Sequence, residues 1–126
     1  MMVLGSGGVS MLAQRTQAAA ALVVEFKRHG LWPPLVPTPV LTECLTGSPA
    51  RDANTNRFLK TCHVEPVVPE RTARRAASLR TQARVGSAID ALVVAVAEPG
   101  GTVVTSDPGD INTLCSYAAG VAVKTV

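Results

Sequence analysis

Three carboxylates that can do chemistry lie close together in the stretch GSAIDALVVAVAEPGGTVVTSDPGDI. Asp90 falls in the first turn of a helix that Ser87 would cap, and Asp107 follows a short apolar strand, Thr102–Thr105. The proline after Asp107 suits the start of a further helix, which would hold Asp110 in its first turn. Ligands of parallel α/β sheets collect at the carboxyl ends of strands. We therefore expect this stretch to supply half of an acidic, metal-binding pocket.

A fourth carboxylate, Glu43, belongs to a different part of the chain. The pattern predicts that Thr38 caps its helix and that Pro39 opens it, with Glu43 at the edge of the apolar stripe. A carboxylate in that position must reach solvent or find a partner. A bound cation is one such partner, and an arginine or water at the rim is the alternative.

The three later acids also have ordinary structural roles open to them. Ser87-x-x-Asp90 matches a capping box, Asp107 can cap a helix, and the helix dipole favours Asp110. The combination favours a metal, because Glu43, Asp90 and Asp107 all fall near element ends that a parallel sheet brings to one edge. Converging carboxylates repel one another, and Mg²⁺ or Mn²⁺ relieves that repulsion through oxygen ligands.

The elements that position these acids alternate along the chain between strand and helix. This alternation is typical of a parallel sheet between helical layers. The length of 126 residues fits one domain with one core. We therefore expect a single domain, residues 1–126, with the α/β fold of a three-layer α/β/α sandwich and a central, mainly parallel sheet. Strands are predicted at Met2–Leu4, Leu35-Val36, Val64–Val68, Thr102–Thr105 and Val121–Val126. A short helix is predicted after the first strand and its glycine-rich loop, ending at about Gln14. Further helices are predicted over Thr16–His29, from Thr38, up to about Cys62, over Pro69–Gln82, from Ser87, and from Pro108 to Cys115–Tyr117.

Composition narrows the class of protein. An apolar content of 47% with 17% charged residues is that of a globular chain, and with few aromatic residues the core must consist of Val, Leu and Ala. Cys44, Cys62 and Cys115 form no CxxC pair, so we expect free buried thiols in a reducing cytoplasm. The longest apolar run, Ala18–Val24, is too short to span a membrane, and no signal peptide is indicated.

A net charge of +3 mildly favours an anionic partner. Arg71, Arg74 and Arg75 cluster on one face of a predicted helix, whereas Arg80 and Arg84 fall roughly opposite. The cluster is either a solvated helix surface or a phosphate-binding rim near the acidic pocket.

The glycine-rich segment after the first strand suggests a rival interpretation. Gly5-x-Gly7 is the start of a dinucleotide-binding fingerprint, but its third glycine would fall on Ser10. No acid ends a second strand at the required distance. A nucleotide-binding regulator is therefore a weak alternative.

Four segments, in their order and spacing, cover nearly the whole chain: VLGSGGVSML at the start, PTPVLTECL around Glu43, GSAIDALVVAVAE around Asp90 and VVTSDPGDINTL around Asp107. With these segments the chain resembles a PIN-domain ribonuclease, specifically the VapC-type toxin of a bacterial toxin–antitoxin pair. The resemblance implies one PIN-like domain and a Mg²⁺-dependent endonuclease that cuts structured RNA, such as transfer or ribosomal RNA.

The resemblance also implies roles for individual side chains. Glu43, Asp90 and Asp107 match the acids of the family's metal site, and Asp110 matches a frequently acidic neighbour. The polar residues that match substrate-positioning places around this site are Ser6, Thr105 and Ser106.

Gly5 is a departure from the family's pattern, in which the first strand usually ends in a metal-binding aspartate. Its absence removes one negative charge and one oxygen ligand, so we expect weak metal binding and little or no nuclease activity. Either a deliberate inactivating substitution or a natural degenerate copy explains the glycine.

The resemblance finally implies partners. They are a second copy of the chain in a homodimer and a cognate antitoxin, a segment of which would cover the acidic pocket. A cytoplasmic location follows, with no membrane partner. The alternative is a non-catalytic module of the same fold that holds RNA or the antitoxin without cutting.

Overall fold

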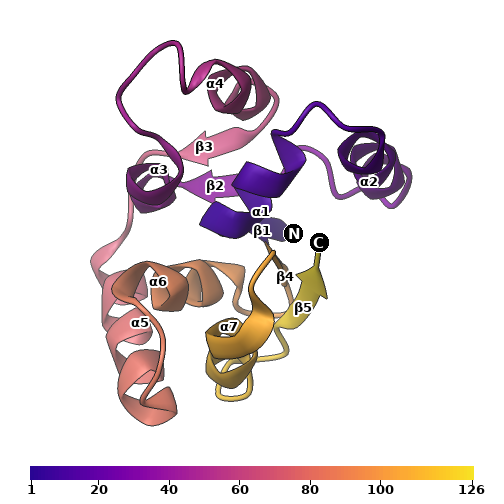
Figure 1. Cartoon of the computed structure of the whole chain (residues 1–126). Coiled ribbons are helices and arrows are strands. Elements are labelled where there is room, and N and C mark those ends of the chain that lie inside the picture. Colours follow the sequence, from indigo (N-terminus) through magenta and orange to yellow (C-terminus); the bar gives the residue numbers. More distant parts are fainter.

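A five-stranded sheet runs through the middle of the protein, and all of its strand pairs are parallel (Figure 1). The computed structural model describes residues 1–126. The strand order is β3-β2-β1-β4-β5. The strands are β1 Met2–Leu4, β2 Leu35–Pro37, β3 His63–Glu65, β4 Thr102–Thr105 and β5 Ala122–Thr125. The expectation of a mainly parallel sheet is confirmed, with the first strand at its centre.

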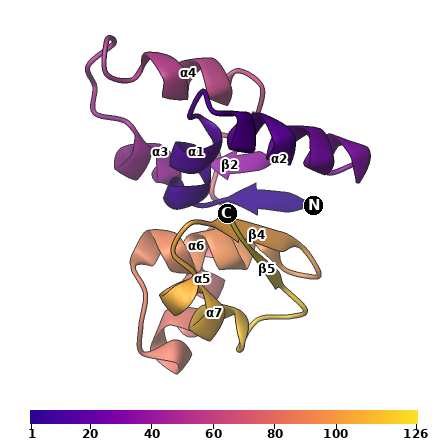
Figure 2. The ribbon, with the colours of Figure 1, turned by 45° about the vertical axis from the view of Figure 1, so that its right-hand side comes forward.

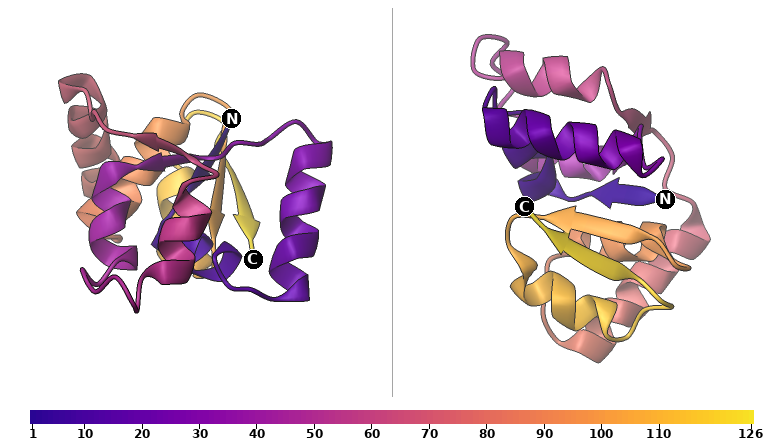
Figure 3. Two further views of the ribbon diagram at one scale, coloured as in Figure 1. Left: turned by 90° about the horizontal axis from the view of Figure 1, so that it is seen from above. Right: turned by 90° about the vertical axis from the view of Figure 1, so that its right-hand side faces the viewer.

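Seven helices cover the two faces of this sheet. They are α1 Ser6–Leu12, α2 Gln17–Arg28, α3 Thr38–Cys44, α4 Ala53–Leu59, α5 Glu70–Ala83, α6 Ala88–Ala97 and α7 Pro108–Cys115. Figures 2 and 3 show α1, α2 and α4 on one side of the strands and α5, α6 and α7 on the other. The chain is therefore the expected three-layer α/β/α sandwich. None of the helices has both the length and the apolar character needed to cross a lipid bilayer.

Valine and leucine fill the core, as the shortage of aromatic residues predicts. All of β1 is buried, and Val103 and Val104 of β4 are fully buried beside it. From the helices, Val9, Leu79 and Leu114 are also inaccessible to solvent. A strand buried on both faces must be apolar throughout, which is why β1 and β4 show no polar alternation.

The strand order reverses direction at β1, and this reversal positions the acidic residues. From β1 the chain builds outward through β2 to β3, and then returns to place β4 on the other side of β1. The loops after β1 and β4 consequently leave the sheet toward opposite faces. At such a point the carboxyl ends of the two strands border a crevice where ligands bind in open α/β sheets.

Two glycines let α1 lie directly on the end of β4. A Cβ on Gly8 would lie 2.5 Å from the carbonyl oxygen of Val104, and a Cβ on Gly7 would collide with the Ser106 hydroxyl. Only residues without a side chain permit this approach. The first turn of α1 is thereby held against the loop that carries Asp107.

Several predicted element ends were wrong, each for a local reason. Thr38 does not cap α3: it lies inside the helix, Pro37 occupies the cap position, and the Thr38 hydroxyl lies 3.5 Å from the Pro66 carbonyl oxygen. The third strand ends at Glu65 and not at Val68, since proline at 66 has no N–H to donate to a neighbouring strand.

The buried side of α5 is narrow. Ala76, Leu79 and Ala83 are buried, but Ala73 and Ala77 are exposed. The fourth helix is also shorter, because α4 ends at Leu59 and leads to Cys62 through a turn.

Candidate acidic site

One pocket of about 340 Å³ lies at the carboxyl ends of β1 and β4. It is enclosed by the loops after these strands together with the ends of α3, α6 and α7. Its lining residues are Gly5, Ser6, Gly7, Glu43, Asp90, Thr105, Ser106, Asp107, Asp110 and Ile111. All eight residues that the sequence singled out for a site are among them, although they come from four separate parts of the chain.

Asp90 is half-buried and makes the capping box that its spacing predicts. Its N–H donates to Ser87 Oγ over 3.0 Å, and its Oδ2 accepts the Ser87 N–H over 3.3 Å. These bonds fix the carboxylate at the first turn of α6. They use one carboxylate oxygen, while Oδ1 has no hydrogen bond within the protein. The structural role and a ligand role are therefore compatible for this residue.

Asp107 is held by its backbone, and its carboxylate is left free. Its N–H donates to Thr105 Oγ1, and the Thr105 hydroxyl lies 3.1 Å from the Asp107 carbonyl oxygen. Asp107 occupies the cap position of α7, but its side chain makes no capping bond. The predicted helix-capping bond is thus absent. The buried Thr105 sets the turn that presents Asp107 at the pocket.

The pocket gathers the acids of the chain that lack cationic partners. Of the nine Asp and Glu residues, four pair with arginine or histidine, and Asp52 accepts bonds from Thr46 and Gly47. The remaining four have no ion pair, and all four line this pocket: Glu43, Asp90, Asp107 and Asp110. Such uncompensated negative charge attracts a cation.

The oxygen atoms of the four carboxylates are suitable ligands for a hard cation, but they are not gathered closely enough to form a complete site. Carboxylate oxygens are what Mg²⁺ and Mn²⁺ prefer. As the side chains stand, however, no three carboxylate, thiol or imidazole groups form a cluster that could hold a metal ion. Glu43, Asp107 and Asp110 are all exposed.

Gly5 lies where a further oxygen ligand would fit. It has extended backbone angles (φ −79°, ψ 176°) at the N-cap of α1. A Cβ built on it meets only the Val104 carbonyl oxygen, at an ordinary 3.8 Å. Neither conformation nor space therefore requires glycine here, in contrast to Gly7 and Gly8. An aspartate would fit and would also be a favourable cap.

The arginine cluster of α5 does not border this pocket. Arg75 makes a two-bond ion pair with Glu98, at 2.8 Å for each bond, and Arg74 pairs with Glu70. Glu98 follows the last turn of α6, whereas Asp90 lies in its first turn. A phosphate-binding rim formed by Arg71, Arg74 and Arg75 beside the acids is thus wrong, because these residues lie toward the other end of α6.

The basic side chains next to the acidic pocket are Arg80 and Arg84, at the other end of α5. They line a neighbouring hollow together with Gly86, and a Cβ on Gly86 would lie 3.8 Å from Asp90 Cβ. The helical spacing places them on the opposite face of the helix and by itself gives them no role. The one sequence feature that could have indicated a role for Arg80 and Arg84 is their position just before the segment that carries Asp90.

The three cysteines are unpaired, as expected, and all are half-buried. Burial raises the pKa of the Cys62 and Cys115 thiols to about 11. Neither thiol is therefore set up as a nucleophile at neutral pH.

Comparison with known proteins supplies no family for this chain. No protein-family model and no curated protein sequence matches it. Its function is therefore inferred from the acidic pocket and from the segments that line it.

Proposed function

We propose that the chain is a PIN-like toxin of the VapC type, a Mg²⁺-dependent endoribonuclease that cuts structured RNA and is impaired here by Gly5. One observation carries the proposal: four carboxylates without cationic partners line one pocket at the reversal point of a parallel sheet. The order and spacing of the segments around Glu43, Asp90 and Asp107 support the same function.

In this proposal Glu43, Asp90 and Asp107 would hold the metal, with Asp110 beside them. A bound Mg²⁺ would supply Lewis-acid activation of water and stabilise the negative charge that develops on a phosphodiester. The chain's own contribution is to fix the ligands. The Ser87 N–H and hydroxyl hold Asp90, and the Thr105 hydroxyl holds the backbone of Asp107.

Ser6, Thr105 and Ser106 have the substrate-positioning role. Ser6 is the first residue of α1 and Ser106 directly follows β4, and both line the pocket, so a phosphodiester placed between them can accept bonds from both hydroxyls. Proper alignment of the phosphodiester is a large part of the catalytic effect in phosphoryl transfer.

Restoring the acid at position 5 tests the proposal. We expect Gly5→Asp to cleave a mixture of transfer and ribosomal RNA in the presence of Mg²⁺ or Mn²⁺, whereas the Gly5 form shows little or no cleavage. Gly5→Asn is the matched control, because it fills the same space and caps α1 without supplying the charge.

Two further measurements make the test decisive. Expression of Gly5→Asp should arrest growth, and Gly5→Asp combined with Asp107→Asn should not. If Gly5→Asp is folded by circular dichroism, yet neither cleaves RNA nor arrests growth, the nuclease function is rejected.

A second candidate is a non-catalytic module that binds RNA or a cognate antitoxin. The lack of a ready-made ligand cluster favours it, as does the exposure of three of the four acids. In either case we propose a cytoplasmic homodimer with an antitoxin segment over the pocket. A stable complex that forms without metal, combined with an inactive Gly5→Asp, would support this second candidate.

A further inference from the structure

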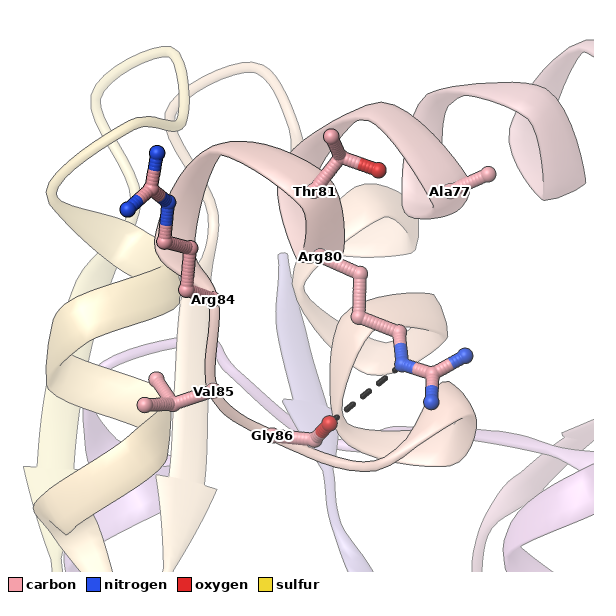
Figure 4. A pocket seen from close by; sticks show the side chains of 6 residues that line it. All are labelled: Ala77, Arg80, Thr81, Arg84, Val85 and Gly86. Carbon is pink, nitrogen blue, oxygen red and sulfur yellow. Dashed lines mark hydrogen bonds between the residues drawn. The ribbon is translucent and has the colours of Figure 1, made fainter.

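A hollow of about 380 Å³ opens beside the acidic pocket, where α5 ends and the chain turns into α6. Its lining is Ala77, Arg80, Thr81, Arg84, Val85 and Gly86 (Figure 4). It contains two cationic side chains and no acid. A positively charged hollow of this kind is a place for an anion.

Both arginines are available to bind an anion. Neither Arg80 nor Arg84 has an ion pair, although two other arginines of the same helix do. The Arg80 Nε–H donates to the Gly86 carbonyl oxygen over 3.3 Å. This bond orients the guanidinium group and leaves its two terminal nitrogens free. Arg80 therefore presents an oriented guanidinium group with two free nitrogens to an acceptor.

Arg84 has an unusual backbone for its residue type. It occupies the left-handed region (φ 58°, ψ 18°) at the C-cap of α5, where glycine is the favoured residue. An arginine at this position carries a conformational cost that glycine would not. A backbone outlier of this kind makes Arg84 a candidate for a functional role.

The arrangement of the two guanidinium groups favours a chain of phosphates over one small ion. Figure 4 shows Arg80 and Arg84 on opposite sides of the hollow, pointing away from one another. A polynucleotide backbone presents phosphates at intervals and can contact both. The hollow also adjoins the acidic pocket through Gly86, which packs beside Asp90.

The position of the two arginines next to the acidic pocket matters for electrostatics. A nucleic acid that approaches four uncompensated carboxylates is repelled, and nearby cations offset that repulsion. We propose that Arg80 and Arg84 bind backbone phosphates of an RNA strand next to the phosphodiester that enters the acidic pocket. This inference rests on the proposed function for the choice of RNA as the ligand.

The test measures RNA binding without catalysis. A fluorescein-labelled RNA hairpin is titrated with the Gly5 form in EDTA, and its anisotropy is followed over a series of salt concentrations. Arg80→Gln combined with Arg84→Gln should raise Kd about tenfold or more. The slope of log K against log salt should become shallower by about 0.7 to 0.9 for each phosphate that the variant no longer neutralises. Inorganic phosphate at equal ionic strength should compete no better than chloride.

Single variants separate binding from folding. Arg84→Gly should weaken RNA binding about three- to fivefold while leaving the melting temperature equal or higher, because glycine relieves the left-handed backbone. Arg84→Lys keeps the charge and should bind within about twofold of the parent. Arg71→Gln is the matched control, since Arg71 is exposed and unpaired on the same helix, about 14 Å from Arg80 and about 20 Å from Arg84 along the helix axis.

The results also distinguish this site from the nuclease proposal. The site is rejected if the double variant binds RNA as the parent does, or if Arg71→Gln weakens binding equally. If Gly5→Asp cleaves RNA and its KM is unchanged by the double variant, the nuclease stands and the arginine site falls. If Gly5→Asp is inactive while RNA binding still requires both arginines, the arginine site stands and the nuclease falls.

Discussion

Gly86 is the residue that joins the arginine hollow to the acidic pocket, and its lack of a side chain is required. It has φ +90°, and a Cβ there would lie 2.8 Å from Leu114 Cδ1. Leu114 is fully buried and cannot easily move away. Both the backbone and the packing therefore select glycine at this position.

We expect Gly86→Ala to lower the free energy of unfolding by about 2–3 kcal/mol, through backbone strain and overpacking together. Urea unfolding measures the change. Gly30→Ala is the control, because Gly30 also has a positive φ, of +69°, but has open space around it. That variant should lose only about 1 kcal/mol. Equal losses in the two variants would show that the contact with Leu114 has no energetic weight.

Residue types and spacing predicted the acidic pocket well for definite reasons. Asp90 and Asp107 lie at element ends that the adjacent residues in the sequence predict: Ser87 caps α6, and a strand leads into Asp107. A parallel sheet then brings such ends to one edge. The pairing of Arg75 with Glu98 was not predictable in the same way, because these residues are far apart in sequence and meet only when α5 packs against α6.

At the scale of elements, the ion pair between Arg75 and Glu98 connects three segments. Besides the two bonds to Arg75, Glu98 Oε2 accepts the Ala119 N–H over 2.8 Å, and the Arg75 guanidinium donates to the Tyr117 carbonyl oxygen. The pair therefore ties α5 and the end of α6 to the loop between α7 and β5. This junction lies toward the amino ends of the strands, away from the acidic pocket.

Glu98→Gln should destabilise the fold by about 1–2 kcal/mol at pH 7, since the pair is partly exposed. The Arg75 guanidinium and the Ala119 N–H hold the pKa of Glu98 below its ordinary value. A carboxylate with a lowered pKa stabilises the folded state above its unfolded pKa and loses that contribution as pH falls through the folded pKa.

The difference between Glu98→Gln and the parent should therefore be full at neutral pH and shrink in acid, below about pH 4. Thermal melts across this pH range measure it. Glu70→Gln removes the exposed pair with Arg74 and is the control, with a change of about 0.5 kcal/mol or less. A difference for Glu98→Gln that does not change with pH would contradict the ionic nature of the junction.

Element ends were harder to predict than element types. The alternation of strands and helices followed from apolar runs, glycines and prolines in the sequence. Thr38 was expected to cap α3, yet the helix extends through it and its hydroxyl approaches the Pro66 carbonyl oxygen. That contact depends on the pairing of β2 with β3, and the sequence around Thr38 carries no information about this pairing.

At the scale of the whole molecule, the distribution of negative charge is uneven. Acids outside the pocket are paired or, like Asp52, surrounded by donors, whereas the four acids in the pocket repel one another. The molecule therefore carries an unfavourable charge arrangement at a single place. Such local cost is common at functional sites.

Neutralising one pocket acid should accordingly stabilise the protein. We expect Asp107→Asn to raise the melting temperature by about 1–3 °C at low salt, and the gain should disappear in high salt because exposed charges are screened. Calorimetry at two ionic strengths measures it. Asp52→Asn should instead lower the melting temperature, since the Thr46 and Gly47 donors lose a charged acceptor. A loss of stability in Asp107→Asn would mean that its carboxylate has a structural partner.

The close packing of α1 on β4 limits which mutations could add an acid at the start of α1. Because Gly7 and Gly8 hold α1 in place, the helix cannot slide by one residue to offer another side chain where Gly5 stands. In the proposed nuclease, the further oxygen ligand would therefore come from position 5. A glycine codon becomes an aspartate or glutamate codon through a single base change, so one mutation separates this sequence from the acid that the proposed nuclease would use at position 5, and the backbone there already accepts a side chain.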